Sequence, residues 1–426
     1  MLDIKLLRKD RQIIEAKLKT KDPNVNLTPI LELDEEVRAL KTEAEEIKNN
    51  RNLLSKQIGE KKRSGEDTSS LMSDVSGLGK KVSDLDHKIA EKEALLIDLL
   101  SRLPNIPSSE AKVSQNVEDN VVLRTHGKKP TFSFEPKNHV ELNEQLHLFD
   151  FKRAAKIAGS SWPAYKKNGA KLEWALLNYM LDIHQENGFT FWLPPLMVRP
   201  EIAFGSGNLP KFKDQLFKIH DEDYHLYIIP TSEMALMGLH NNEILEAQDL
   251  PLRYVSYTPC FRREAGGLGA QERGLIRMHQ FNKVEMFAYT RPEDSEAMFE
   301  EMVKSAEEIL RGLDLHFRTT FLVTGDMSFS AAKTLDIEVW LPGQNRYYEV
   351  SSVSNCTDFQ ARRSNTRFKF KEDKPQFCHT LNGSGLATSR LMVALLENNQ
   401  REDGCVEIPI VLHKYLNGMK ELTPEA

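Results

Sequence analysis

The sequence predicts an α+β protein, in which an antiparallel sheet is flanked by helices and preceded by an antiparallel coiled-coil arm. Three observations predict this class. Apolar side chains near the N-terminus recur at alternating spacings of three and four, as in a heptad seam. Prolines then mark a linker at 103–109. Beyond it, helical and β-rich runs follow one another without the rhythm of βαβ units. We therefore expect two domains, residues 1–108 and 109–426.

The arm is predicted from two seams separated by a polar turn at 62–68. The first seam consists of Ile30, Leu33, Val37, Leu40, Ala44, Ile47, Arg51, Leu54 and Ile58. The second consists of Leu71, Val75, Leu78, Val82, Leu85, Ile89, Lys92, Leu96, Leu99 and Leu103. Two such helices joined by a short turn should fold back on each other. Arg51 and Lys92 interrupt the seams, and we expect both side chains to snorkel outward.

Charge is unevenly distributed along this arm. Its base is acidic, whereas its tip carries Lys48, Arg51, Lys56, Lys61, Lys62, Arg63, Lys80 and Lys81. The whole chain has a net charge of −6, so contact with nucleic acid requires a local basic patch of this kind. Most heptad helices are solvated coiled coils or dimerisation devices. A stalk with a basic end also suits a phosphate backbone.

Composition indicates a soluble protein, with 40% hydrophobic and 28% charged residues. The sequence has four cysteines, Cys260, Cys356, Cys378 and Cys405. They lie far apart and form no C-x-x-C motif, so we expect neither a disulfide framework nor a structural zinc site. Charges interrupt the first residues, and no apolar run approaches the roughly 20 residues that span a bilayer. We expect a cytoplasmic location.

The second domain begins with an amphipathic helix that ends at Gly188. Its apolar face comprises Leu172, Ala175, Leu176, Tyr179 and Ile183. Strands are then predicted at 189–193, closed by two prolines, and at 226–230, leading into Thr231-Ser232-Glu233. Further strands are predicted at 336–340 and 347–352. A Gly-rich strand end at 381–385 leads into a helix that carries Arg390.

The most informative segment is a predicted hairpin between 260 and 285 with a Gly-rich tip. Strand periodicity places Arg262 and Glu264 on one face of its first strand. It places Arg277, Phe281 and Glu285 on one face of the second. Guanidinium groups, an aromatic ring and carboxylates do not pack well in a hydrophobic core, but together they can bind an anionic group and a nucleotide base. A lone R-x-E is usually part of a solvated sheet face, so the interpretation depends on the other segments.

Taken in order, these segments resemble the three signature motifs of class II aminoacyl-tRNA synthetases. The helix, strand and prolines resemble the first motif, Phe261-Arg262-Arg263-Glu264 the second, and 383–390 the third. With the arm, Thr231-Ser232-Glu233 and the run from His279 to Glu285, the chain is similar over essentially its whole length to bacterial-type seryl-tRNA synthetases. The resemblance implies a class II synthetase-type antiparallel sheet and a serine–tRNA ligase activity.

The resemblance also implies a role for each site residue. Arg262 and Arg390 are the implied catalytic residues. The implied ATP-binding set is Arg262, Arg263, Glu264, Arg277, Phe281, Glu349, Val350, Ser351, Ser352 and Arg390. The implied serine-binding set is Thr231, Ser232, Glu233, Arg262, Glu285, Asn382 and Ser384. Glu349 and Ser352 would carry Mg²⁺, which prefers oxygen ligands. Because these two are three residues apart, a bulge near Ser351 is needed for them to face the same way.

The same resemblance implies tRNA(Ser), and tRNA(Sec) as well, as partners of the basic arm tip, and a homodimer formed through the first motif. Arg263, Trp174 and the tip at 267–273 depart from the family pattern, and the tip is the segment that the resemblance places at the tRNA acceptor end. Glu338 is interpreted as a structural carboxylate, and Lys333, Asp336 and His279 as residues that pack or that support the residues of the site. Two alternatives stay open: a class II paralogue that loads another amino acid or a carrier protein, and a catalytically silent RNA-binding coiled-coil protein.

Overall fold

The computed structural model describes residues 1–264 and 274–424. The chain divides into two compact units, Leu2–Pro104 and a larger one that comprises Met1 with Asn105–Ala426. This division falls inside the predicted linker, slightly before the expected boundary at 108. Among the helices that the structure describes, none has the length and hydropathy needed to cross a bilayer.

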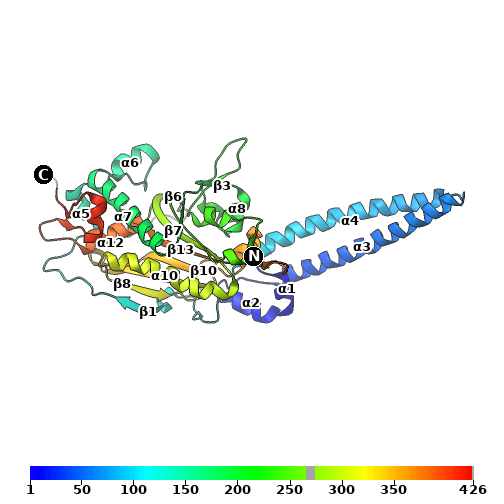
Figure 1. The fold of residues 1–426 in the computed structure, drawn as a ribbon, viewed down its shortest axis with the longest axis horizontal. Coiled ribbons are helices and arrows are strands. Elements are labelled where there is room, and N and C mark those ends of the chain that lie inside the picture. Colours follow the sequence, from blue (N-terminus) through cyan, green and yellow to red (C-terminus); the bar gives the residue numbers. More distant parts are fainter. Residues whose placement is uncertain (265–273, 425–426) are drawn as a thin grey trace. The chain divides into compact units, whose positions relative to one another are not determined.

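The smaller unit is built around a long antiparallel helical hairpin (Figure 1). Its helices are α1 (Ile4–Lys9), α2 (Arg11–Lys19), α3 (Thr28–Arg63) and α4 (Ser69–Ser101). The buried seam residues are Ile30, Leu33, Val37 and Ala44 on α3, and Val82, Leu85, Ile89 and Leu96 on α4. The predicted hairpin and its seam are therefore confirmed.

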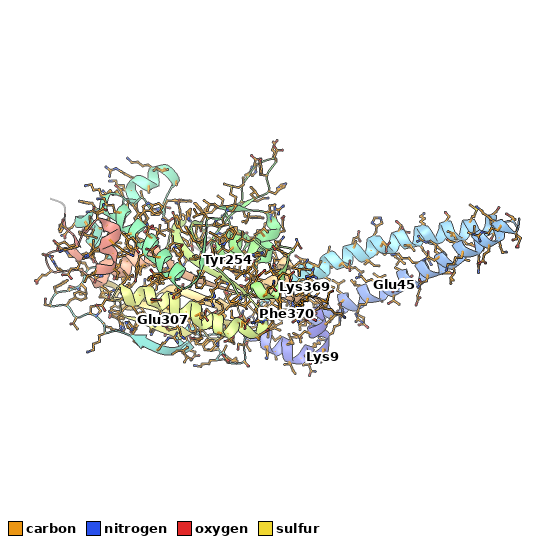
Figure 2. All side chains as sticks on the ribbon, in the orientation of Figure 1. Lys9, Glu45, Tyr254, Glu307, Lys369 and Phe370 are labelled. Carbon is orange, nitrogen blue, oxygen red and sulfur yellow. The ribbon has the colours of Figure 1, made fainter. Side chains whose placement is uncertain are left out.

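Polar side chains line the outside of the hairpin, and Figure 2 shows them projecting along both helices, with Glu45 as an example. Lys92 leaves the seam as expected and pairs with Glu36 on the opposite helix. A second cross-helix ion pair joins Lys41 and Glu93. Exposed pairs of this kind contribute about 0–1 kcal/mol each, so the apolar seam is the main source of stability.

The larger unit is centred on an eight-stranded sheet with the order β1-β8-β9-β10-β13-β7-β6-β2. Its strands are β1 (Val121–His126), β2 (Thr190–Trp192), β6 (Leu252–Phe261), β7 (Gln280–Thr290), β8 (Phe317–Phe321), β9 (Lys333–Leu341), β10 (Arg346–Asn355) and β13 (His379–Ala387). Neighbouring strands are antiparallel, as predicted, except that β2 pairs with β6 in parallel at the edge. The sheet is therefore mixed. Two further sheets have two strands each: β3 (Met197–Val198) pairs with β4 (Tyr227–Ile228), and β14 (Val406–Glu407) pairs with β15 (Glu421–Leu422). A third has three strands in the order β12 (Gln376–Phe377), β11 (Arg367–Lys369) and β5 (Ile244–Glu246).

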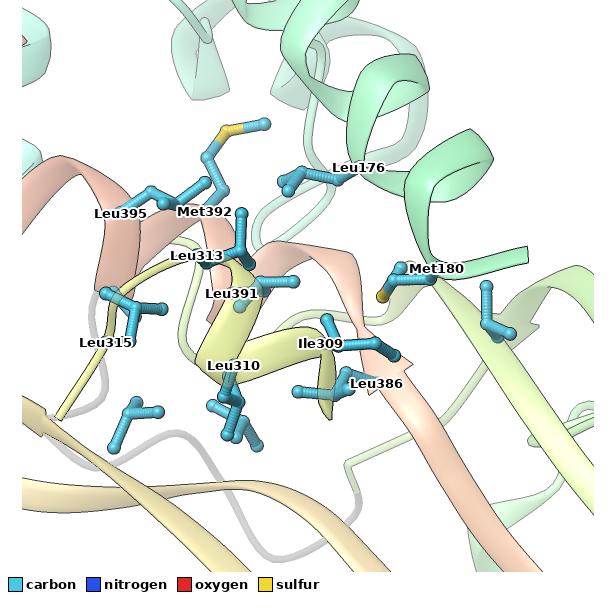
Figure 3. Close-up of a cluster of buried hydrophobic side chains, with 14 of the residues drawn as sticks. Leu176, Met180, Ile309, Leu310, Leu313, Leu315, Leu386, Leu391, Met392 and Leu395 are labelled. Carbon is cyan, nitrogen blue, oxygen red and sulfur yellow. The ribbon is translucent and has the colours of Figure 1, made fainter. Parts of the chain in front are cut away.

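Three helices pack on one face of the sheet: α7 (Lys167–Glu186), α10 (Ser295–Gly312) and α12 (Thr388–Asn398). Figure 3 shows their shared core, in which Leu176 and Met180 of α7 meet Ile309 and Leu310 of α10 and Leu391 of α12. Burying each such side chain stabilises the fold by about 1.5–3 kcal/mol. The peripheral helices α5 (His139–Leu146) and α6 (Phe151–Ala158) precede α7 in the chain.

The opposite face of the sheet carries α8 (Pro200–Gly205), α9 (Glu233–Gly238) and α11 (Phe359–Ser364) over a second core. Strand β7 separates the two cores by parity. Val284 and Met286 contact the first core, and Phe287 and Tyr289 the second. The odd-numbered residues from 283 to 289 therefore face the α8–α9 side, whereas Phe281 at the start of β7 also packs against the first core. This alternation positions the site described below.

The predicted hairpin exists, but its strands are shorter than expected. Because β6 ends at Phe261 and β7 begins at Gln280, placing Arg262, Glu264 and Arg277 within strands was wrong. One further ladder bond, from Arg262 N to His279 O at 2.9 Å, extends the pair. Glu264 then adopts a left-handed φ of 47°, which no strand residue has. The predicted tip at 267–273 lies outside the described residues.

Candidate active site

Two adjoining cavities lie over β7, β10 and β13. The first is lined by Arg262, Glu264, Ile276, Arg277, Met278, Phe281, Lys283, Glu349, Val350, Ser384, Ala387, Ser389 and Arg390. The second is lined by Ser206, Gly207, Asn208, Phe212, Thr231, Glu233, Arg262, Lys283, Glu285, Ser328, Phe329, Ser330, Glu349, Ser352, Ser354, Asn382 and Ser384. Four residues, Arg262, Lys283, Glu349 and Ser384, line both cavities, so one group could contact molecules in each.

The first cavity combines a ring with paired charges. The Arg262 guanidinium lies 5.0 Å from the centre of the Phe281 ring. Arg277 Nε donates to Glu264 Oε2 at 2.6 Å, which holds that carboxylate beside the ring although neither residue is in a strand. An aromatic face next to a carboxylate and two guanidinium groups can accept a planar base and anionic groups together.

Arg390 enters the first cavity from the start of α12. Its Nη1 donates to the backbone oxygen of Glu349 at 2.9 Å and lies 3.3 Å from Glu349 Oε2. The guanidinium also stacks over the Tyr348 ring at 4.9 Å. These contacts with β10 fix the orientation of the Arg390 side chain.

A β-bulge brings Glu349 and Ser352 to the same face of β10. Glu349 pairs with Glu338 on β9, whereas Ser351 pairs with Ile337, so Val350 is the extra residue. The expected bulge near Ser351 is confirmed, and both side chains line the second cavity. Glu338 accepts from Arg318 at 2.5 Å and from Thr320 at 3.0 Å, as a structural carboxylate would.

Asp336 lies beside this bulge, opposite Ser352 on β9. Burial, and then the Glu349 carboxylate, raise the pKa of Asp336 well above its usual range. Its Oδ1 is buried and accepts no hydrogen bond from the part of the chain that the structure describes. Two carboxylates therefore repel each other here, and a bound cation would relieve that repulsion.

The second cavity is polar, and Glu233 occupies one wall. Gln360 Nε2 donates to Glu233 Oε1 at 2.7 Å, and Asn382 Nδ2 donates to the same oxygen at 3.2 Å. Burial, and then the nearby Glu285 carboxylate, raise the pKa of Glu233 to about 7. The cavity therefore offers carboxylate and amide groups on one side and the Arg262 guanidinium on the other.

Lys283 lines both cavities and was missed by the sequence analysis. Its side chain is 7% exposed, its Nζ lies 2.7 Å from Thr231 Oγ1, and it forms an ion pair with Glu285. Parity could have found it, because residues 281, 283 and 285 share one face of β7. Ser384 is the cross-strand neighbour of Glu285 on β13, which places its side chain in both cavities.

Three of the predicted site side chains do not line either cavity. Ser232 is fully buried and accepts from Ser256 Oγ at 2.6 Å. Ser351 Oγ donates to the backbone oxygen of Ser384 at 2.5 Å. Arg263 is exposed and lines a separate groove with Lys213 and Lys218. The other predicted ATP- and serine-binding residues are brought together.

The basic residues of the arm tip belong to the smaller unit. Lys48 pairs with Asp86 at 2.9 Å, and Lys61 with Glu66 at 3.5 Å. Within the described ranges, the other six form no ion pair: Arg51, Lys56, Lys62, Arg63, Lys80 and Lys81. These six charges are therefore not held in ion pairs with other described residues.

Comparison with known proteins agrees with both units. Residues 1–107 match the family model for the seryl-tRNA synthetase N-terminal domain, and residues 217–399 match that for the tRNA synthetase class II core domain (G, H, P, S and T). Proteins named "Serine--tRNA ligase" from Chlamydia abortus and Chlamydia caviae are 54% and 55% identical, over 424 and 425 residues that cover all of each chain.

The chain belongs to the seryl-tRNA synthetase family.

Solved structures of family members have the same fold. The seryl-tRNA synthetase from Pyrococcus horikoshii complexed with ATP is 40% identical, with a TM-score of 0.94 over all of both chains. The cytoplasmic enzyme from Naegleria fowleri in complex with AMP is 27% identical, with a TM-score of 0.88 over 100% of this chain and 99% of that one. The predicted class II synthetase fold with its helical arm is confirmed.

Proposed function

We propose that this family member joins serine to tRNA in two steps at the two adjoining cavities. In the first step, the serine carboxylate attacks the α-phosphorus of ATP to give seryl-adenylate and pyrophosphate. In the second step, the terminal ribose hydroxyl of tRNA(Ser) attacks the adenylate. Family membership gives the reaction class, an ATP-dependent serine–tRNA ligase. The observation that supports the location is that Arg262 lines both cavities.

ATP occupies the first cavity in this proposal. Its base stacks on Phe281 and donates from its amino group to Glu264, while Arg277 and Arg390 contact the outer phosphates. The Pyrococcus horikoshii relative was solved with ATP, which supports the assignment of the nucleotide. Val350 contributes a wall of the same cavity. Since Arg263, Ser351 and Ser232 do not line the cavities, we assign them no direct ligand contact.

Serine occupies the second cavity. Its ammonium group meets Thr231 and Glu233, and its hydroxyl meets Glu285 and Ser384, with Asn382 holding Glu233. Buried hydrogen-bonding partners for a hydroxyl can reject an analogue that lacks it by about 10⁴–10⁵-fold. This polarity suits serine and disfavours alanine.

Arg262 acts in the first step by positioning and by charge stabilisation. The serine carboxylate is already ionised near neutral pH, so its attack requires no general base. A new bond forms between a carboxylate oxygen and the α-phosphorus, and the bond from that phosphorus to the pyrophosphate oxygen breaks. The planar Arg262 guanidinium can donate to both the carboxylate and the α-phosphate and offset the charge that develops between them.

The residues near the β10 bulge fit a magnesium ion. Glu349 and Ser352 share a face, and Asp336 beside them has a buried oxygen without a hydrogen bond. We propose that Glu349 and Ser352 hold Mg²⁺, with Asp336 behind them, because hard cations take oxygen ligands. When bound, the ion would neutralise charge on the phosphates. Among the described residues, no group of three or more His, Cys, Asp or Glu forms a self-sufficient metal site, which agrees with an ion shared with a ligand.

We propose that residues 1–108 form a tRNA-binding domain and residues 109–426 the catalytic domain. The arm of the first domain binds the tRNA backbone through its basic tip, including Lys48 and Lys61. We extend this to tRNA(Sec), which the same enzyme would charge with serine. Deleting residues 27–103 should abolish tRNA charging and spare adenylate formation. Loss of both activities would mean that the arm does more than hold tRNA.

A homodimer is proposed through the first motif. Several large apolar side chains are exposed there: Trp174, Phe191, Trp192, Leu193, Leu196 and Met197. Leu193 is 72% exposed, and clustered apolar exposure of this kind marks association surfaces. A cytoplasmic location is also proposed, because all four cysteines are buried free thiols.

Amino-acid-dependent ATP–pyrophosphate exchange with a panel of serine, threonine, alanine, cysteine and glycine tests the function. We expect strong exchange with serine alone and strong loss in Arg262→Ala, which should remain folded. Exchange with another amino acid would favour the paralogue alternative. Absence of exchange with every amino acid would favour the silent RNA-binding alternative, and near-full exchange by Arg262→Ala would refute the role of Arg262.

A further inference from the structure

Glu173 is a buried carboxylate at the junction of the three motifs, on the side of the sheet opposite the cavities. It lies on α7 and is 4% exposed. Asn282 Nδ2 of β7 donates to Glu173 Oε1 at 2.9 Å, and the hydroxyl of Thr388, the first residue of α12, donates to the same oxygen. Figure 1 locates the three elements that meet at this oxygen: α7, β7 and α12.

Both donors are next to residues that line the first cavity. Asn282 lies between Phe281 and Lys283, whose side chains point to the other face of β7. Thr388 lies two residues before Arg390. Thr388 Oγ1 is also 3.1 Å from the backbone oxygen of Asn282, so β7 and α12 are joined at this point. A shift at Glu173 would therefore move the ring and the guanidinium that flank the proposed nucleotide.

Among the residues that the structure describes, no lysine, arginine or histidine pairs with Glu173, and its Oε2 accepts no hydrogen bond. The hydroxyl of Tyr165 is buried without a partner as well. Burial, and then the Glu173 carboxylate, raise the pKa of the Tyr165 phenol. A buried carboxyl without a cation, and with one oxygen that accepts no hydrogen bond, costs stability, so its presence at this junction indicates a use other than stabilising the fold.

The acidity of Glu173 agrees with this geometry. Burial raises its pKa to about 7, and the hydrogen bonds from Thr388 and Asn282 oppose the shift. A glutamine would offer the same Oε1 acceptor without the charge. The oxygen at this position, rather than the charge, therefore holds the two donors together.

We propose that Glu173 is a positioning residue for adenylate formation, which clamps β7 to the start of α12 through Oε1 and thereby holds Phe281 and Arg390 around ATP. The inference rests on the proposed nucleotide site. Glu173 touches no substrate in this arrangement. Its effect should appear in ATP binding and in the first chemical step, and serine affinity should change little.

Two pairs of substitutions in the full-length enzyme test the clamp. Glu173→Ala removes the acceptor oxygen of the clamp, and Thr388→Val removes the donor hydroxyl. Glu173→Gln keeps an acceptor oxygen, and Thr388→Ser keeps a hydroxyl. We expect each disruptive change to weaken equilibrium binding of a non-hydrolysable ATP analogue, measured by calorimetry, by about tenfold. It should also lower kcat of exchange by about tenfold, with KM for serine within about twofold. The conservative changes should stay within about threefold of the wild type.

A double variant and a matched control make the result specific. The losses in Glu173→Ala with Thr388→Val should be smaller than the sum of the two single losses, because the two changes share the hydrogen bond from Thr388 to Glu173. Glu397 is the control: it is a fully buried carboxylate at the other end of α12, where it accepts from Gln344 and Gly343. Glu397→Ala should lower the melting temperature and leave ATP affinity unchanged.

Several outcomes would overturn the clamp. They are wild-type ATP affinity in a folded Glu173→Ala, additive losses in the double variant, or an equal loss of ATP affinity in Glu397→Ala. If Glu173→Ala does not fold, Thr388→Val against Thr388→Ser decides the same question. A wild-type enzyme that binds the ATP analogue but shows no serine-dependent exchange would contradict the proposed function and leave the clamp to be judged on ATP affinity.

Discussion

The Nζ of Lys283 lies 2.7 Å from the hydroxyl oxygen of Thr231 and forms an ion pair with Glu285, beneath both cavities. Glu233 and Glu285 interact there closely enough to raise the pKa of Glu233, after the larger effect of burial, and the Lys283 ammonium opposes that shift. Lys283 is therefore the buried cation that allows two carboxylates to share one amino-acid pocket.

Replacing Lys283 by methionine should impair serine binding more than ATP binding. Methionine fills a similar volume and removes the charge, which leaves the buried Glu285 without its ion-pair partner. Removing one partner of a buried pair commonly costs about 3–5 kcal/mol. We expect KM for serine in pyrophosphate exchange to rise at least tenfold, while KM for ATP changes less. Lys333→Met, which removes a lysine paired with Glu110 and Glu296, is the control and should leave both constants unchanged.

Serine activation should become more efficient as pH rises through neutrality. The pKa of Glu233 in the free enzyme is about 7, so its carboxyl is mostly protonated at about pH 6 and ionised at about pH 8. The ionised form attracts the serine ammonium, which stays protonated over this range. The value of kcat/KM for serine should therefore increase from about pH 6 to about pH 8. In Glu233→Gln this increase should disappear, and an unchanged pH profile would contradict the assignment.

Most of the architecture was predictable because its signals are periodic or local. The arm seam repeats over many turns, and the strands of the second and third motifs are marked by alternation and by glycines. The parallel pairing of β2 with β6 was not predictable, because it joins segments that are distant in sequence. The left-handed Glu264 was missed because nothing in the R-x-E pattern shows where a strand stops.

The sequence predicted most of the residues of the site, but it did not predict where all of their side chains lie. Arg263 lines a separate groove, and its backbone N–H donates to Gln215 O at 3.0 Å, a long-range contact that a local pattern does not encode. Lys283 was accessible from parity on β7. It was overlooked because a lysine in a strand is usually solvated, and its burial depends on Thr231 and Glu285 from separate segments.

Glu349→Gln should raise the requirement for Mg²⁺. The amide keeps an oxygen and loses the charge, and it also removes the repulsion that raises the pKa of Asp336 after burial. We expect the Mg²⁺ concentration for half-maximal exchange to increase about tenfold, since losing one charged ligand weakens a hard-cation site. Glu338→Gln, at the carboxylate bound by Arg318, should leave that concentration unchanged.

Gly385→Ala should destabilise the end of β13. An added Cβ would overlap the ring of His184, which is held by Ser305 Oγ at 2.7 Å and by the Gly385 oxygen at 3.1 Å. Overpacking at a fixed contact commonly costs about 1–3 kcal/mol. The free energy of unfolding in urea should fall by that amount, and adding His184→Ala should recover part of the loss. An alanine variant as stable as the wild type would show that the ring can move aside.

Neutralising the arm tip should weaken tRNA charging and spare adenylate formation. The six tip residues without ion pairs are the ones to replace by glutamine: Arg51, Lys56, Lys62, Arg63, Lys80 and Lys81. KM for tRNA(Ser) should rise about tenfold or more near physiological salt, because each neutralised phosphate contributes through counterion release. The log–log slope of kcat/KM against salt should become less negative by roughly 0.7–0.9 for each phosphate that the variant no longer neutralises. The control is Lys41→Gln, which removes a lysine already paired with Glu93 and should keep the wild-type slope. If the variant with all six substitutions keeps the wild-type salt slope, these side chains do not contact the phosphate backbone of tRNA. Another surface of the protein would then have to bind tRNA.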